Sequence, residues 1–173
     1  AEHIANATGL LILAGAGMGV DSGLPDYRGN AGFWRAYPVL REANVKLDDI
    51  ATPQSFVDDP DLAWGFSGHR IRLYRDTKPH EGFGILLRWG EAMGDGWWAQ
   101  TTNVDGQFQR AGFDPRYLHE IHGTLHELQC AKPCTDDTWS ADRLEPAVDS
   151  SLRWHGWPVC RRCGGVTRPN VLM

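Results

Sequence analysis

Four cysteines in the last quarter of the chain have the spacing of a metal site. Cys130 and Cys134 are separated by three residues, and Cys160 and Cys163 by two. Two such turns facing each other can present four thiolates to one tetrahedral Zn²⁺, whereas a disulfide pair or unrelated thiols is the alternative interpretation. We find no secretory signal, so reduced thiols that bind zinc are favoured over disulfides. Four sulfur ligands leave no open position, so this zinc would support structure and would not activate water.

The segment LLILAGAGMGVDSGLPDYRG, residues 10–29, joins an apolar run to a glycine-rich turn. Residues 9–14 are predicted to form a buried strand of a parallel sheet covered on both faces. A turn with little side chain lets backbone N–H groups approach a ligand, and a helix N-terminus after it favours anionic groups. The pentapeptide GAGMG alone is a weak signal, because the full G-x-G-x-x-G spacing is absent. Asp26 and Arg28, on either side of an aromatic residue after the turn, indicate ligand contact rather than a helix cap.

The elements that must position these groups alternate between strand and helix, with an insertion. Strands are expected at residues 97–102, at 117–123 and again near the end of the chain, and a helix at residues 79–93. Residues 29–47 mix glycine, proline, aromatic and charged residues without a clear period, so we predict a long functional loop there. Residues 52–75 are predicted to form a small helical module that begins at Thr52 and Pro53 and is broken near DDPD.

Composition excludes several classes of protein. The 173 residues are 42% hydrophobic and carry a net charge of −5, which is typical of a soluble globular protein rather than a disordered or membrane protein. No apolar run is long enough to span a bilayer, and basic residues are scattered rather than clustered, so neither a membrane nor a direct nucleic-acid contact is evident. Without a targeting segment, we expect a cytoplasmic protein.

Three separated stretches, together with the cysteine pairs, resemble the signature of the sirtuins, which are NAD-dependent protein deacylases. The stretches are GAGMGVDSGLPDYRG, TTNVDGQFQRAG and EIHG, in the order and spacing of that family. The resemblance runs over essentially the whole chain and implies an α/β fold: a Rossmann-like parallel sheet, incomplete at its C-terminus, with an inserted small helical module and a zinc-ribbon module. Residues 1–173 would form a single sirtuin-type catalytic domain, incomplete before the segment that clamps the substrate peptide. Within it, residues 30–80 would form the cofactor loop and helical module, and residues 128–165 the zinc-binding module.

The resemblance also implies roles for individual residues. The residues that would bind NAD fall into three groups: Gly15, Ala16 and Gly17 along the pyrophosphate; Asp26, Tyr27 and Arg28 in the loop over the nicotinamide ribose; and Asn103, Asp105 and His122 around the nicotinamide and ribose. Asn103 and Asp105 would hold the nicotinamide amide where the glycosidic bond is cleaved. His122 would act as the general base, a task that suits a neutral imidazole at physiological pH. The substrate would be an acylated-lysine protein or peptide, whose acyl group passes to ADP-ribose while nicotinamide is released.

Two departures from the family pattern leave alternatives open. Gly19 stands where the family usually has serine, and Thr102 stands where it usually has glutamine. Both positions are near the ribose, so an NAD-dependent ADP-ribosyltransferase or an NAD hydrolase on the same fold is the alternative. A third hypothesis is a non-catalytic module that senses NAD or ADP-ribose, or a zinc-stabilised interaction domain. The presence of His122, the expected general base, argues against it. The remaining conspicuous histidines are expected to be surface residues: His69, His80, His119 and His126.

Overall fold

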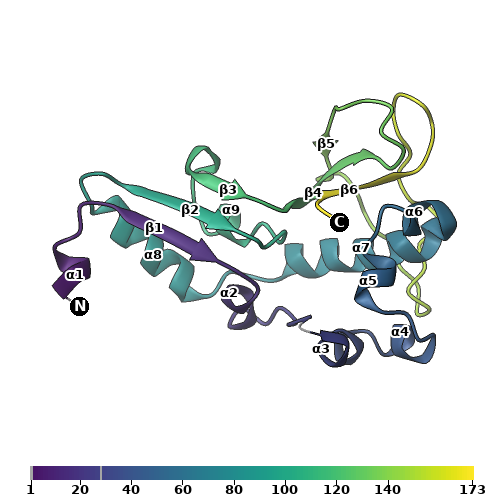
Figure 1. Cartoon of the computed structure of the whole chain (residues 1–173), viewed down its shortest axis with the longest axis horizontal. Coiled ribbons are helices and arrows are strands. Elements are labelled where there is room, and N and C mark those ends of the chain that lie inside the picture. The colour runs from purple at the N-terminus through teal and green to yellow at the C-terminus, as the bar shows by residue number, and fades with distance from the viewer. Residues whose placement is uncertain (1, 28) are drawn as a thin grey trace.

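A three-stranded parallel sheet and a three-stranded antiparallel sheet lie toward opposite ends of the chain's long axis, with a long helix running beside the second (Figure 1). The computed structural model describes residues 2–27 and 29–173. The parallel sheet has the strand order β1 (Leu10–Ala14), β2 (Trp97–Thr101), β3 (Leu118–Glu120). The antiparallel sheet has the order β5 (Trp139–Ser140), β4 (Gly123–Cys130), β6 (Thr167–Val171).

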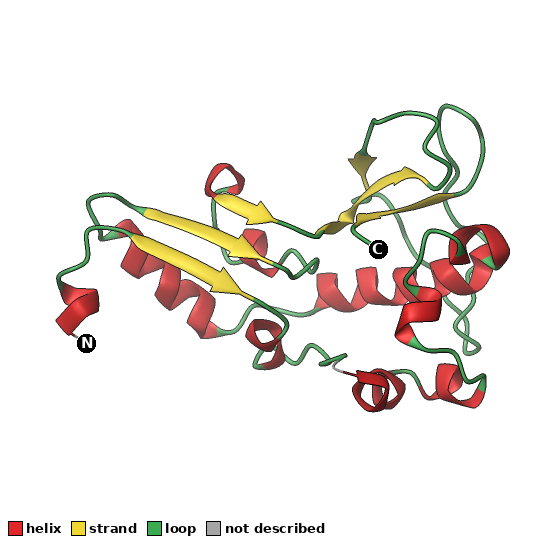
Figure 2. Cartoon of the chain, viewed as in Figure 1, coloured by secondary structure: helices red, strands yellow, loops and turns green. Residues whose placement is uncertain are grey.

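Most of the helices lie below the two sheets in the view of Figure 2. In chain order they are α1 (Glu2–Ala5), α2 (Gly17–Val20), α3 (Gly29–Ala36), α4 (Pro38–Glu42), α5 (Leu47–Ile50), α6 (Ser55–Asp58), α7 (Pro60–Asp76), α8 (Glu81–Glu91), α9 (Gln107–Arg110) and the 3₁₀ turn η1 (Pro115–Tyr117). No helix in the described ranges is long and apolar enough to cross a membrane. The predicted Rossmann-like α/β fold with a helical module is confirmed.

Helix α8 packs against the parallel sheet, as its sequence period predicted. Gly90 allows this close approach, because a Cβ at that position would lie 2.5 Å from the Cβ of Trp97 on β2. Phe83 and Phe108 meet in the buried core below the strands, with ring centroids 5.0 Å apart. The strand expected at 97–102 and the helix expected at 79–93 are therefore confirmed.

The predicted cover of β1 is seen on one face only in the described residues. Alternate side chains of a strand point to opposite faces, and here Ile12 is buried while Leu11 and Leu13 are 64% and 69% exposed. Helices from the described part of the chain cover one face only.

The long loop predicted for residues 29–47 is also wrong, because this segment forms helices α3 and α4 and reaches the start of α5. Pro38 occupies the first turn of α4, where its missing N–H costs nothing. Phe33, Tyr37 and Leu40 are at most 3% exposed and pack against Phe66 of α7. Burial of these aromatic rings stabilises helices too short to show a sequence period.

The helical module that follows agrees better with expectation. The break near DDPD is confirmed, because α6 ends at Asp58 and α7 begins at Pro60. Asp59 caps α7, with its Oδ1 accepting a hydrogen bond of 3.2 Å from the N–H of Leu62. The predicted start at residues 52–53 is two residues early for α6.

The strand expected over residues 117–123 is shorter than predicted. β3 ends at Glu120, and His122 lies in the turn that leads into β4. Gly123 starts β4 with φ +74°, a left-handed conformation that suits glycine. The predicted strand after residue 166 is confirmed as β6.

Candidate functional site

The carboxyl ends of the three parallel strands bring distant segments of the chain to one edge of the sheet. After β1 and β2 end, the N–H of Thr102 donates to the carbonyl of Ala14 at 3.1 Å. The Nδ2 of Asn103 donates to the carbonyl of Gly15 at 2.9 Å. Ligands of open α/β sheets bind at this edge. The structure therefore joins the glycine-rich turn directly to the Asn103 segment, as the site hypothesis requires.

The glycine-rich turn leaves backbone groups available for a ligand. The carbonyls of Gly15 and Ala16 accept hydrogen bonds from the N–H groups of Met18 and Gly19, which starts α2. The N–H groups of Ala16 and Gly17 have no hydrogen-bond acceptor among the described residues. Such unpaired N–H groups suit a phosphate oxygen. The donor set thus fits the pyrophosphate of NAD.

Asp105, in the segment that follows β2, is buried, with 7% of its surface exposed. Its Oδ1 accepts a hydrogen bond of 2.9 Å from the N–H of Gln107, at the start of α9. Burial raises the pKa of the Asp105 carboxyl above its ordinary value. Gly19 reaches the same place from the other side, since a Cβ on it would lie 3.5 Å from the Asp105 Oδ2. The first motif and the Asp105 segment therefore meet.

His126 fixes the Asp105 loop, which contradicts its expected surface role. Its Nε2 lies 3.0 Å from the backbone carbonyl of Asp105, so this nitrogen carries the proton and donates. The ring also contacts Gly106, where a Cβ would lie 2.8 Å from the His126 Cδ2. Burial lowers the pKa of His126. Its partner is a backbone carbonyl 21 residues away, so no sequence pattern would have revealed the contact.

His122 stands at the junction of the two sheets. The N–H of Ile121 donates to the carbonyl of Thr101 at 3.0 Å, and the N–H of Leu172 donates to the carbonyl of His122 at 2.9 Å. These bonds hold the backbone on both sides of a half-buried imidazole. The ring itself makes no hydrogen bond to any residue that the structure describes, so both ring nitrogens remain available to a substrate.

The loop predicted to close over the ribose is anchored through Tyr27. Its ring stacks on Tyr37, with centroids 5.9 Å apart, and its hydroxyl lies 3.2 Å from the Tyr37 hydroxyl. Arg70 of α7 lies beneath it, with its guanidinium 5.5 Å from the centre of the Tyr27 ring. The predicted neighbour Asp26 precedes this anchor, whereas Arg28 lies outside the described residues. The sequence analysis did not identify Arg70. Only its place on a buried helix distinguishes it from the other arginines.

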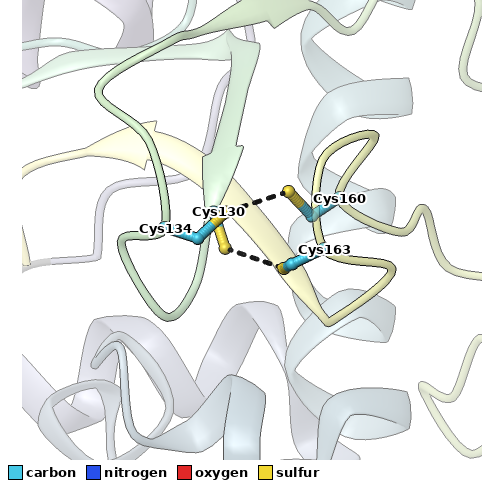
Figure 3. Close-up of side chains that lie close together, drawn as sticks. All are labelled: Cys130, Cys134, Cys160 and Cys163. Carbon is cyan, nitrogen blue, oxygen red and sulfur yellow. Dashed lines mark hydrogen bonds between the residues drawn. The ribbon is translucent and has the colours of Figure 1, made fainter.

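The four cysteines converge as predicted (Figure 3). All four sulfurs lie within 4.8 Å of one another. The Sγ atoms of Cys130 and Cys163 are 3.7 Å apart, and those of Cys134 and Cys160 are 3.6 Å apart. Zn–S bonds of about 2.3 Å in a tetrahedron place sulfurs about 3.8 Å apart. Backbone N–H groups of Cys163 and Arg162 lower the pKa of Cys160, whereas burial and the neighbouring thiols raise the pKa of Cys134. The site fits a structural zinc ion.

Comparison with known proteins agrees with this geometry. The model of the Sir2 family matches residues 15–173. An NAD-dependent protein deacylase 2 from Pyrobaculum aerophilum is 33% identical over 172 residues, which cover 99% of this chain and 61% of the relative. An NAD-dependent protein deacylase from Aeropyrum pernix is 34% identical over 172 residues, with 99% and 62% covered.

Solved structures agree as well. The structure of a Sir2 homologue in complex with NAD matches with a TM-score of 0.77 and 26% identity, over 99% of this chain and 59% of that one. The chain thus spans about three fifths of the length of the relatives it matches.

Proposed function

Because the chain belongs to the Sir2 family, we propose that the protein is an NAD-dependent protein lysine deacylase, which transfers the acyl group to ADP-ribose and releases nicotinamide. One observation carries the proposal: the glycine-rich turn, the segment of Asn103 and Asp105, and the turn at His122 each follow one of three neighbouring parallel strands, whose carboxyl ends lie at one edge of the sheet. Relatives that are a third identical bear the name of this activity.

The residues at the edge divide the work by chemical type. The free N–H groups of Ala16 and Gly17 bind the pyrophosphate. Asn103 and Asp105 hold the carboxamide of nicotinamide, since an amide and a carboxyl group together can pair with both its N–H and its carbonyl groups. When bound, NAD supplies the electrophilic ribose carbon that accepts the acyl oxygen.

His122 takes a proton from a ribose hydroxyl in this proposal. Its half-buried ring has no competing hydrogen bond from a described residue, and hydrogen bonds on both sides hold its backbone. A positioned acid–base group contributes about 10² to 10⁴ in rate. A zinc ion held by the four cysteines would have no open coordination position and would stabilise the fold around the antiparallel sheet.

The test is mass spectrometry of the products formed from NAD and an acetyl-lysine peptide. We expect nicotinamide, the unmodified peptide and acetylated ADP-ribose in equal amounts. Label from NAD that ends on the protein or peptide would instead indicate ADP-ribosyl transfer, and free ADP-ribose without peptide turnover would indicate NAD hydrolysis. Either result would overturn the deacylase proposal.

A variant assigns the proton transfer. His122→Ala is expected to lower product formation by about 10² to 10⁴-fold while NAD binding stays nearly intact. Nicotinamide exchange should survive better than deacylation, because the base acts after nicotinamide has left. Equal loss of both activities, with the fold and NAD affinity unchanged, would place His122 at or before glycosidic cleavage.

A further inference from the structure

His80, expected to be a surface residue, connects the glycine-rich segment to helix α8. It is the N-cap residue of α8, and its Nδ1 accepts a hydrogen bond of 3.0 Å from the N–H of Gly82. Its Nε2 lies 3.0 Å from the carbonyl of Met18 in α2. The backbone N–H of His80 donates to the hydroxyl of Ser22 at 2.9 Å. One residue therefore holds both ends of the short segment 18–22, directly after the turn at Gly15.

These partners fix the tautomer of the ring. A backbone N–H can only donate, so Nδ1 must carry a lone pair, and a carbonyl can only accept, so Nε2 must carry the proton. The neutral Nε2–H tautomer is the one form that makes both bonds.

Gly82 makes the arrangement possible. A Cβ at this position would overlap the His80 Cε1 and lie 2.8 Å from its Nδ1. On the other side, the ring packs edge-on against Phe83, with centroids 5.0 Å apart. The imidazole thus fills a slot that a side chain at residue 82 would close.

We propose that His80 is a positioning residue that fastens the glycine-rich turn to α8, and that loss of its ring releases the turn and weakens NAD binding. The link to NAD rests on the proposed function, whereas the fastening of the turn does not. Loss of the hydrogen bond to the Met18 carbonyl removes a contact worth about threefold to tenfold in the population of the ordered turn.

A double-mutant cycle tests the fastening without NAD. His80→Asn keeps a good helix cap but is too short to span from Gly82 to Met18, so amide hydrogen exchange at residues 17–24 should rise about threefold to tenfold. Gly82→Ala should give a similar rise by displacing the ring. In the His80→Asn background, Gly82→Ala should add nothing, because no ring is left to displace. Additive effects, or unchanged exchange in both single variants, would overturn the proposal.

NAD affinity tests the consequence for the site. His80→Asn and Gly82→Ala should each lower NAD affinity about threefold to tenfold, because the turn is ordered in a smaller fraction of the molecules. Unchanged NAD affinity in both variants would refute this consequence. A protein that bound no NAD at all would refute the proposed function instead, and hydrogen exchange would still decide the fastening.

Discussion

Gly123 is the residue after His122, and replacing it by alanine tests how tightly the two sheets are joined there. Its φ of +74° is left-handed, and a Cβ on it would overlap the carbonyl oxygen of Asn170 on β6. Gly123 also pairs with Val171 in the ladder between β4 and β6. Gly123→Ala therefore imposes both backbone strain and a steric overlap with a neighbouring strand.

The two costs can be estimated separately. A left-handed conformation costs a non-glycine residue about 1 to 2 kcal/mol. To relieve the overlap, the end of β6 must shift away and lose the pairing at Val171 and the hydrogen bond from Leu172 to the carbonyl of His122. Two hydrogen bonds at about 1 kcal/mol each bring the total to about 3 to 4 kcal/mol. For a domain of this size, this loss lowers Tm by about 6 to 16 °C.

The assay is urea unfolding followed by tryptophan fluorescence, since the chain has 8 tryptophans. Gly96→Ala is the matched control: its φ is +71°, and a Cβ there would meet nothing within 4 Å. The free energy of unfolding of the control should fall by about 1 to 2 kcal/mol, so the unfolding free energies of the two variants should differ by about 2 kcal/mol. Equal losses in both variants would show that the approach of Gly123 to Asn170 contributes nothing and would refute the reasoning.

Three further predictions address the metal, the nicotinamide pocket and pH. Protein purified without chelators should hold one equivalent of zinc by metal analysis, and Cys163→Ala should lower both zinc content and Tm; well under one equivalent in the unsubstituted protein would contradict this. Asp105→Asn should abolish most nicotinamide exchange with NAD, so a variant with normal exchange would remove Asp105 from the pocket. Burial raises the pKa of Glu120 to about 7, against the opposing hydrogen bond from Gln109. The folded state therefore favours the protonated carboxyl, and the free energy of unfolding falls as pH rises from about 4.5 to 7. The Glu120→Gln variant should have the same free energy of unfolding as the unsubstituted protein near pH 4 and a value about 1 to 2 kcal/mol higher at pH 8. Urea unfolding at both pH values measures this difference.

Short motifs with a chemical requirement were the part of the molecule that the sequence predicted best. Paired cysteines must converge if they bind one ion, and their sulfurs lie within 4.8 Å. A strand followed by glycines predicted the turn at Gly15, and the order of strands then placed Asn103 beside it. These features depend on spacing along the chain, so the sequence alone was sufficient.

Features that depend on distant packing could not be predicted. The helices at residues 29–42 exist because Phe33 and Tyr37 are buried against α7, a contact that no local pattern records. The roles of His80 and His126 depend on the backbone carbonyls of Met18 and Asp105. Every residue has such a carbonyl, so the sequence carries no sign of which one a histidine will meet.

The departure from the family pattern at Gly19 is built into the packing around it. A Cβ on Gly19 would lie 3.0 Å from the Leu24 Cδ1, so the buried leucine occupies the space that a larger residue would need. The same Cβ would lie 3.5 Å from the Asp105 Oδ2, so a side chain at residue 19 would also reach the Asp105 carboxyl. Burial is the main cause of the raised pKa of Asp105. Restoring serine at residue 19 alone would therefore crowd Leu24, and a fair test of this departure changes both residues together.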